Sequence, residues 1–125
     1  MGTQMSTADD ENHHLNRDQQ VRAHFDRMTR VYLLSVLDDE LIEEHRTANG
    51  KHPSEPLARF LTWSQRRPLT EQYAVKAEAD GAFRLVCFSG RRGQPPHYIG
   101  DERYATLQEA RHGAFLRHVK DLTET

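Results

Sequence analysis

The last quarter of the chain holds the pattern that most constrains its fold, an amphipathic helix preceded by its own start signal. Thr106 is placed to act as the N-cap, because its hydroxyl can accept a hydrogen bond from the backbone N–H three residues on. Glu109 can reach back to the N–H of the cap, which completes a capping box. One broad side of the helix is apolar and carries Leu107, Ala110, Ala114, Phe115, Val119 and Leu122. Such a helix needs an apolar surface to lie on.

We expect a β-hairpin to supply that surface, because the apolar period changes to two from Glu71. Asp80-Gly81 predicts a two-residue type I′ turn. This turn sets the pairs on the face expected to receive the helix: Tyr73 with Phe88, Val75 with Val86 and Ala77 with Arg84. The other face, with Phe83, Leu85 and Cys87, is half polar. Residues 97–99 suit a short third strand at the edge.

A long helix is predicted from Asp18, where Val21, Phe25, Met28 and Tyr32 follow one another at helical spacing. Leu34, Leu37 and Leu41 continue the pattern, and Asn49-Gly50 predicts a stop near Thr47 or Ala48. Residues 31–37 are apolar almost all round, so we expect them to be covered on more than one side. Another subunit or the second helix of the chain could provide the second surface.

Ser54 can cap that second helix, which runs through Leu57, Phe60, Leu61 and Trp63 and ends before Pro68. The predicted class is therefore α+β: a long N-terminal helix, a second helix, an antiparallel hairpin with a possible short third strand, and a C-terminal helix packed on the sheet. Residues 1–16 are polar and predict a mobile tail, and 17–125 predict a single small domain.

Charge and cysteine content restrict the classes of function and the cellular compartment that we expect for this chain. With 17 Lys and Arg against 19 Asp and Glu, the net charge of −2 disfavours general nucleic-acid binding. The single cysteine, Cys87, cannot form an internal disulfide, which fits a reducing compartment. No apolar run is long enough to cross a bilayer and the N-terminus is polar, so we expect a cytoplasmic protein.

A search for catalytic chemistry finds no complete site. The eight histidines show no metal-ligand spacing, and His13-His14 lack a third ligand nearby. The acidic residues Asp38, Asp39, Glu40, Glu43 and Glu44 could bind a cation or transfer protons, but a solvated helix face is favoured. Cys87 lies in a strand, where a thiol is more often buried than nucleophilic. No catalytic, metal-binding or cofactor-binding residue is predicted.

Two segments carry a family resemblance. The first is Glu44-His45 leading into Gly50-Lys51-His52-Pro53-Ser54, with Leu57 and Arg59 after it. The second is Gly100-Asp101-Glu102-Arg103-Tyr104, Thr106, Glu109-Ala110 and Ala114-Phe115-Leu116-Arg117 towards Asp121. Together, in this order and spacing, they resemble the small (alpha) subunit of bacterial N,N-dimethylformamidase. The hairpin and the N-terminal tail depart from the family pattern, which leaves a subunit of a related amidase as an alternative.

The resemblance implies a large (beta) subunit that carries the active site. In that family a mononuclear iron, held by tyrosine and carboxylate oxygens of the large subunit, serves the hydrolysis of the amide to dimethylamine and formate. This chain would then be an accessory subunit, with no cofactor of its own, in a heteromer with more than one copy of each chain. No nucleic acid or membrane is expected as a partner.

Four apolar residues are candidates for the subunit interface: Tyr32, Leu34, Trp63 and Leu116. Two other functions stay open from the residues alone. One is a free-standing binding module, for RNA or a protein, that uses Phe83, Arg91 and Arg92. The other is a small metal or thiol enzyme that uses Cys87 and the histidines.

Overall fold

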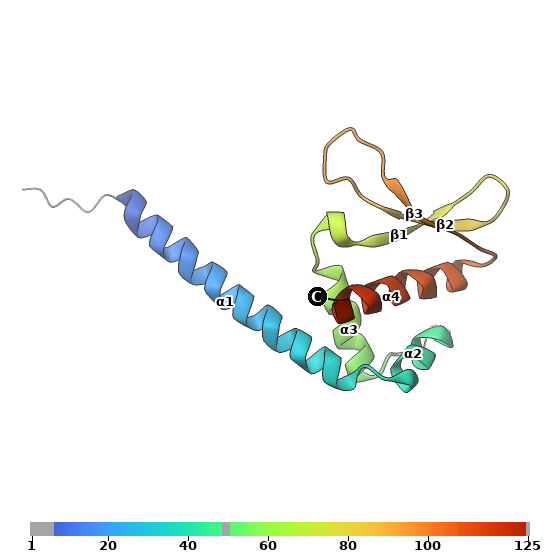
Figure 1. Cartoon of the computed structure of the whole chain (residues 1–125), viewed down its shortest axis with the longest axis horizontal. Helices are drawn as coiled ribbons and strands as arrows, with labels where there is room; N and C mark the ends of the chain where they lie inside the picture. The colour runs from blue at the N-terminus through green and yellow to red at the C-terminus, as the bar shows by residue number, and fades with distance from the viewer. Residues whose placement is uncertain (1–6, 49–50, 125) are drawn as a thin grey trace, which may run out of the picture. The chain divides into compact units, whose positions relative to one another are not determined.

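The computed structural model describes residues 7–48 and 51–124, which form an α+β fold as predicted (Figure 1). The elements follow the chain as α1 (Thr7–Val36), α2 (Asp39–Arg46), α3 (Glu55–Gln65), a 3₁₀ turn η1 (Leu69–Glu71), β1 (Tyr73–Ala77), β2 (Phe83–Cys87), β3 (His97–Tyr104) and α4 (Leu107–Glu124).

The chain divides into two compact units, Met1–Tyr32 and Leu33–Thr125. The first unit contributes most of α1, and the second contains every other element. Helix α1 begins at Thr7, ahead of the predicted start at Asp18. The mobility predicted for residues 1–16 and the single domain predicted for 17–125 stay predictions.

The long helix predicted from Asp18 to Thr47 is interrupted, and this part of the prediction is wrong. Asp38 has extended backbone angles, φ −144° and ψ −179°, and its carboxylate accepts a hydrogen bond from the Leu41 N–H at 2.9 Å. An aspartate that caps a new helix in this way offers the backbone an alternative to continuing the old one. Helix α2 then ends beside Thr47, where the sequence predicted the stop.

Helix α3 forms as predicted. The hydroxyl of Ser54 accepts from the Leu57 N–H at 3.4 Å, and Arg66 ends the helix ahead of Pro68. The Ser54 N–H and hydroxyl both donate to the carboxylate of Glu44, at 2.7 and 2.6 Å. The end of α2 is thereby tied to the start of α3.

The hairpin forms, but in a different register from the predicted one. Tyr73 pairs with Cys87, Val75 with Leu85 and Ala77 with Phe83. The Gly81 N–H donates to the Glu78 carbonyl at 3.1 Å, and the Glu78 N–H donates to the Ala82 carbonyl at 2.8 Å. The loop is thus a turn closed by Gly81, the one loop residue with positive φ, at +90°. A type I turn followed by a left-handed glycine replaces the predicted type I′ turn.

Strand β3 completes an antiparallel sheet with the order β1-β2-β3. It is longer than the predicted residues 97–99, because the chain stays extended through Tyr104. Its pairing with β2 shifts between Phe83 and Leu85, beside Gly100, which has a φ of +67°. The irregularity lets the strand continue past the shift, so that Tyr104 comes opposite Phe83.

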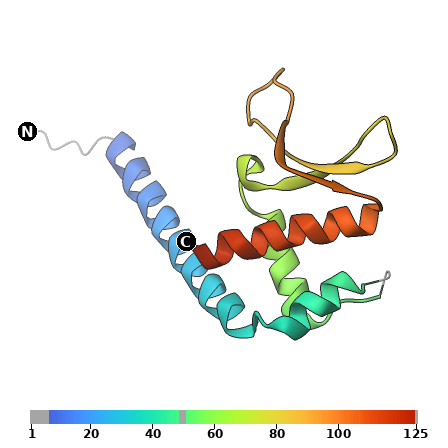
Figure 2. The ribbon, with the colours of Figure 1, turned by 45° about the vertical axis from the view of Figure 1, so that its right-hand side comes forward.

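Helix α4 lies between the sheet and the pair α2 and α3 in the second unit (Figures 1 and 2). The Glu109 N–H donates to the Thr106 hydroxyl at 3.1 Å, which confirms the cap. The Glu109 carboxylate accepts from the Ala105 N–H at 3.2 Å, one residue before the predicted donor. Among the described residues, the largest fully buried side chains are Phe60, Leu33, Leu57, Leu85 and Leu122. Leu85 of the sheet and Leu122 of α4 are both among these side chains, and α4 contacts all three strands, so the predicted apolar surface exists.

Candidate functional site

A histidine pair joins α2 to α4. The Nδ1 atoms of His45 and His112 lie 2.9 Å apart, a distance at which one ring donates a hydrogen bond and the other accepts it. The ring of His45 also stacks on Phe115, with centroids 4.0 Å apart. Burial, and secondarily His112, lowers the pKa of His45 to about 4. Burial also lowers the pKa of His112, so the neutral form of both rings is favoured at pH 7 and the pair acts as a packed contact between helices.

His118 lies deeper in the same unit. It is 7% exposed, its ring meets Tyr73 edge-on at 4.8 Å, and Trp63 lies on another side at 6.3 Å. Its Nδ1 has no hydrogen-bond partner among the described residues. Burial lowers its pKa to about 4. A neutral aromatic ring in the core is the role that these contacts support.

His118 and His45 also line a small cavity of about 170 Å³. Its other walls come from α3, Gln72, Tyr73 and α4, including Arg111. Among the side chains that the structure describes, no three of His, Cys, Asp or Glu come together as a metal site would need. The side chains of His13 and His14 lie outside the described part of the chain.

Cys87 is buried, as predicted, at 3% exposure. Its thiol donates to the Thr70 carbonyl at 3.0 Å, and burial raises its pKa. A wider cavity of about 420 Å³ lies beside it, and there the Tyr73 hydroxyl donates to Asp121 at 2.6 Å. A protonated thiol is a poor nucleophile, so this setting disfavours thiol chemistry at Cys87.

The acidic residues around α2 are mostly exposed, in line with the predicted solvated helix face, and three of them also make individual contacts. Asp38 caps α2, and Glu44 accepts both hydrogen bonds from Ser54. Glu43 forms an exposed ion pair with Arg46 on the same helix. These carboxylates are spread over different contacts and do not converge on one point.

The four predicted interface residues differ in how far they are exposed. Leu34 in α1 is 45% exposed and Leu116 in α4 is 41% exposed, so both are available on the isolated chain. Tyr32 is half-buried. Their role as interface residues stays a prediction.

Trp63 is held within the chain. Its ring packs on Phe60 with centroids 5.5 Å apart, and the guanidinium of Arg67 lies 4.7 Å above it. It is half-buried, with His118 on another side. These contacts fit an anchor within the chain, and its role in an interface stays a prediction.

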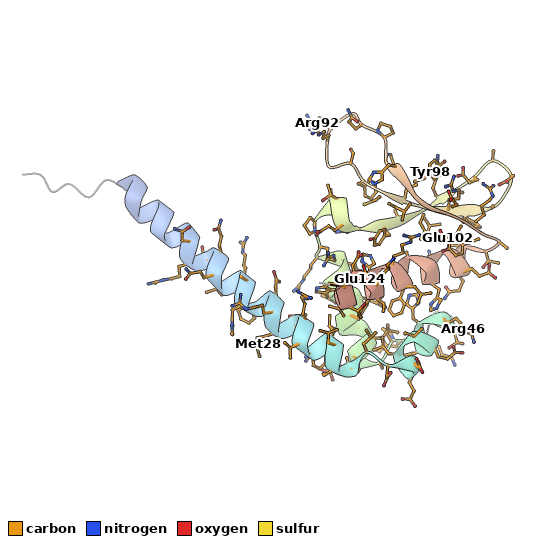
Figure 3. All side chains as sticks on the ribbon, in the orientation of Figure 1. Met28, Arg46, Arg92, Tyr98, Glu102 and Glu124 are labelled. Atoms are coloured by element: carbon orange, nitrogen blue, oxygen red, sulfur yellow. The ribbon has the colours of Figure 1, made fainter. Side chains whose placement is uncertain are left out.

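The structure also exposes apolar residues that were not predicted as interface candidates. Val21, Phe25, Met28 and Val31 are all exposed on α1. Leu69 and Phe88 are exposed beside the loop between β2 and β3, where a hollow of about 320 Å³ also meets Arg91 and Arg92. Figure 3 shows Arg92 at the outer end of this loop and Met28 on α1. The helical spacing predicted the first group, but only the fold reveals that it is uncovered.

Phe83, one of the residues of the RNA alternative, is half-buried in β2 and lies opposite Tyr104 of β3. Only part of its surface is therefore available for stacking on a base, and this alternative stays a prediction. None of the described helices is long and apolar enough to span a membrane.

Comparison with known proteins gives one family. The sequence model of the family described as "N,N-dimethylformamidase alpha subunit" matches residues 20–125. The N,N-dimethylformamidase alpha subunit of Alcaligenes sp. is 33% identical over 107 residues, which cover 80% of this chain and 79% of that relative. The alpha subunit from Paracoccus aminophilus is 29% identical over 104 residues, covering 79% of this chain and 73% of that relative.

Proposed function

Since this chain belongs to the N,N-dimethylformamidase alpha subunit family, we propose that it is the small accessory subunit of an amide hydrolase of that kind. The complex would convert N,N-dimethylformamide and water into dimethylamine and formate. The observation that carries the proposal is the family match, which extends over residues 20–125 and so includes the whole second unit and residues 20–32 of the first. A resemblance in the two short segments alone would not carry it.

In this proposal the large subunit carries out the amide hydrolysis. A mononuclear iron with tyrosine and carboxylate ligands does not fit the donor groups described in this chain. Tyr73 and Asp121 are a tyrosine and a carboxylate in contact, but the phenol donates its proton to the carboxylate. Burial, followed by Asp121, raises the pKa of Tyr73, so the phenolate that an iron ligand requires is disfavoured.

The role left to this chain is to cover apolar surface on the large subunit and to steady its active-site region. Apolar side chains that are exposed on the isolated chain support this role, because burying them against a partner would be favourable. We expect a heteromer with more than one copy of each chain, located in the cytoplasm. Leu34 and Leu116 are the predicted interface residues that remain most exposed.

Co-expression tests this function. The chain is produced alone and together with the large open reading frame adjacent to its gene. Molar mass by light scattering, iron content and release of dimethylamine from N,N-dimethylformamide are then compared. The proposal requires a stable complex that holds iron and hydrolyses the amide. A folded monomer that does not bind the large chain would refute the proposal and would favour a free-standing binding module.

A further inference from the structure

Helix α1 carries an exposed apolar stripe, which we define as Val21, Phe25, Met28 and Val31. Their side chains are 48%, 65%, 56% and 63% exposed. Their spacing of four, three and three residues places them on one side of the helix. Figure 3 labels Met28, whose side chain stands out from the ribbon of α1. The stripe is therefore a continuous apolar surface and not a set of scattered side chains.

An uncovered stripe of this kind is an unusual feature of a soluble helix. Most of the stability of a protein helix comes from packing its apolar side, and contiguous exposed apolar patches mark interaction sites. The family match begins at residue 20, so the stripe lies inside the shared region, and the polar residues before it lie outside. The stripe therefore belongs to the part of the chain that matches a family of enzyme subunits, and a partner subunit is a natural candidate to cover it.

The charges around the stripe describe that partner. Residues 16–32 contain Arg17, Arg22, Arg27 and Arg30 against Asp18 and Asp26, which is four positive minus two negative charges, or +2. The whole chain has a net charge of −2, so this segment is basic within an acidic protein. Two copies of the same segment side by side would bring like charges together. A different chain with an acidic rim is the better match.

We propose that the apolar stripe of α1 docks in an apolar groove with an acidic rim on the large subunit. An amphipathic helix that places side chains at such spacing into a groove is a common mode of recognition. Phe25 and Met28 lie at the centre of the stripe, where burial contributes most. This inference rests on the proposed function, since it names the surface through which the accessory subunit joins the enzyme.

The test compares two variants that add the same charge to opposite sides of α1. Phe25→Asp with Met28→Asp disrupts the stripe, and Gln19→Asp with Ala23→Asp alters the other side. Circular dichroism checks that both variants keep their helix, and titration of the full-length chain into the large subunit measures the dissociation constant. The stripe variant should weaken binding by about 100-fold or more. The control variant should change binding by less than about fivefold.

The wild-type chain separates failure of this inference from failure of the proposed function. If the wild type does not bind the large subunit, the proposed function fails. If the wild type and the stripe variant bind equally well, the stripe is not the docking surface, although the proposed function stands. Equal weakening by both variants would also overturn the inference, because the effect would not depend on the side of the helix.

Two further measurements test which chain binds the apolar stripe. Binding through an acidic rim should weaken as salt rises from about 50 mM to about 500 mM, and unchanged affinity would contradict the charge match. Light scattering of the isolated chain detects self-association. A dimer that Phe25→Asp with Met28→Asp dissociates, without any effect on binding to the large subunit, would assign the stripe to a second copy and overturn the proposal.

Discussion

Gly113 gives the sharpest test of how α4 packs on the sheet. It is buried within the helix, where glycine usually costs about 1 kcal/mol relative to alanine. A β-carbon at this position would overlap the Tyr104 hydroxyl oxygen and would lie 2.6 Å from the ring carbon that bears it, well below van der Waals contact. The close approach of Tyr104 therefore requires a residue without a side chain.

We expect Gly113→Ala to destabilise the protein despite the better helix propensity of alanine. Overpacking a well-filled site costs about 1–3 kcal/mol, and the propensity gain offsets about 1 kcal/mol of this. A net loss of up to about 2 kcal/mol should follow, because the ring of Tyr104 has to move away from α4. Urea unfolding of the full chain, monitored by circular dichroism, measures this difference directly.

The same substitution in a Tyr104→Ala background should change sign. Without the ring, the new methyl group meets no obstacle, and Gly113→Ala should then stabilise by about 1 kcal/mol relative to Tyr104→Ala alone. The two backgrounds would thus differ by about 1–3 kcal/mol, which is the coupling between the two positions. A stabilising Gly113→Ala in the otherwise unchanged chain, or equal effects in both backgrounds, would refute the packing described here.

The buried His118 ring is neutral, because its pKa is lowered from 6.5 to about 4. As the pH falls, this ring is therefore protonated in the unfolded chain before it is protonated in the folded one. Between about pH 7.5 and pH 5 the folded state should lose about 2 kcal/mol from this group, and urea unfolding of His118→Phe should show a smaller loss. Gly81→Ala should lower the free energy of unfolding by about 1–2 kcal/mol in thermal or urea unfolding, because a residue with a β-carbon is strained at a φ of +90°. No atom lies within 4 Å of the added β-carbon, so the loss would come from the backbone alone. An unchanged stability would contradict the turn. Asp38→Ala should cost about 1 kcal/mol in the same assay and Asp38→Asn much less, because asparagine also caps helices.

Local signals in the sequence predicted the helix starts well. Ser54 and Thr106 both cap the helices that follow them, because a cap depends on a hydrogen bond within a few residues. Asp38 is also a cap, yet the apolar pattern continues through Leu37 and Leu41 and predicted an unbroken helix. Whether Asp38 caps a new helix or continues the preceding one depends on how each helix packs, and the spacing of apolar residues alone does not contain that information.

The hairpin register shows a second limit. Asp80-Gly81 is compatible with two turns that differ by one residue in the pairing of the strands. The observed register buries Leu85 and Cys87 on the same face as Tyr73, whereas the predicted one would have placed Arg84 there. Burial of leucine in place of arginine beneath α4 favours the observed turn, and this preference arises only once the helix is in position.

The candidate surfaces were predictable in composition but not in exposure. The apolar spacing of Val21, Phe25 and Met28 was evident, while their exposure required the fold. Trp63 also packs against side chains of its own chain, which its spacing did not show, and its role in an interface stays a prediction. The contact between His45 and His112 joins residues 67 positions apart, so no spacing rule could predict it.

The position of α1 in the chain has a consequence for biosynthesis. A ribosome makes Thr7–Val36 before any strand of the sheet, so this helix is complete while β1, β2 and β3 are still being translated. If the apolar stripe docks as proposed, a nascent chain can engage the large subunit before its own α+β unit has folded. Assembly of the two chains during translation would then shield the stripe from proteases and from aggregation at the stage when it is most exposed.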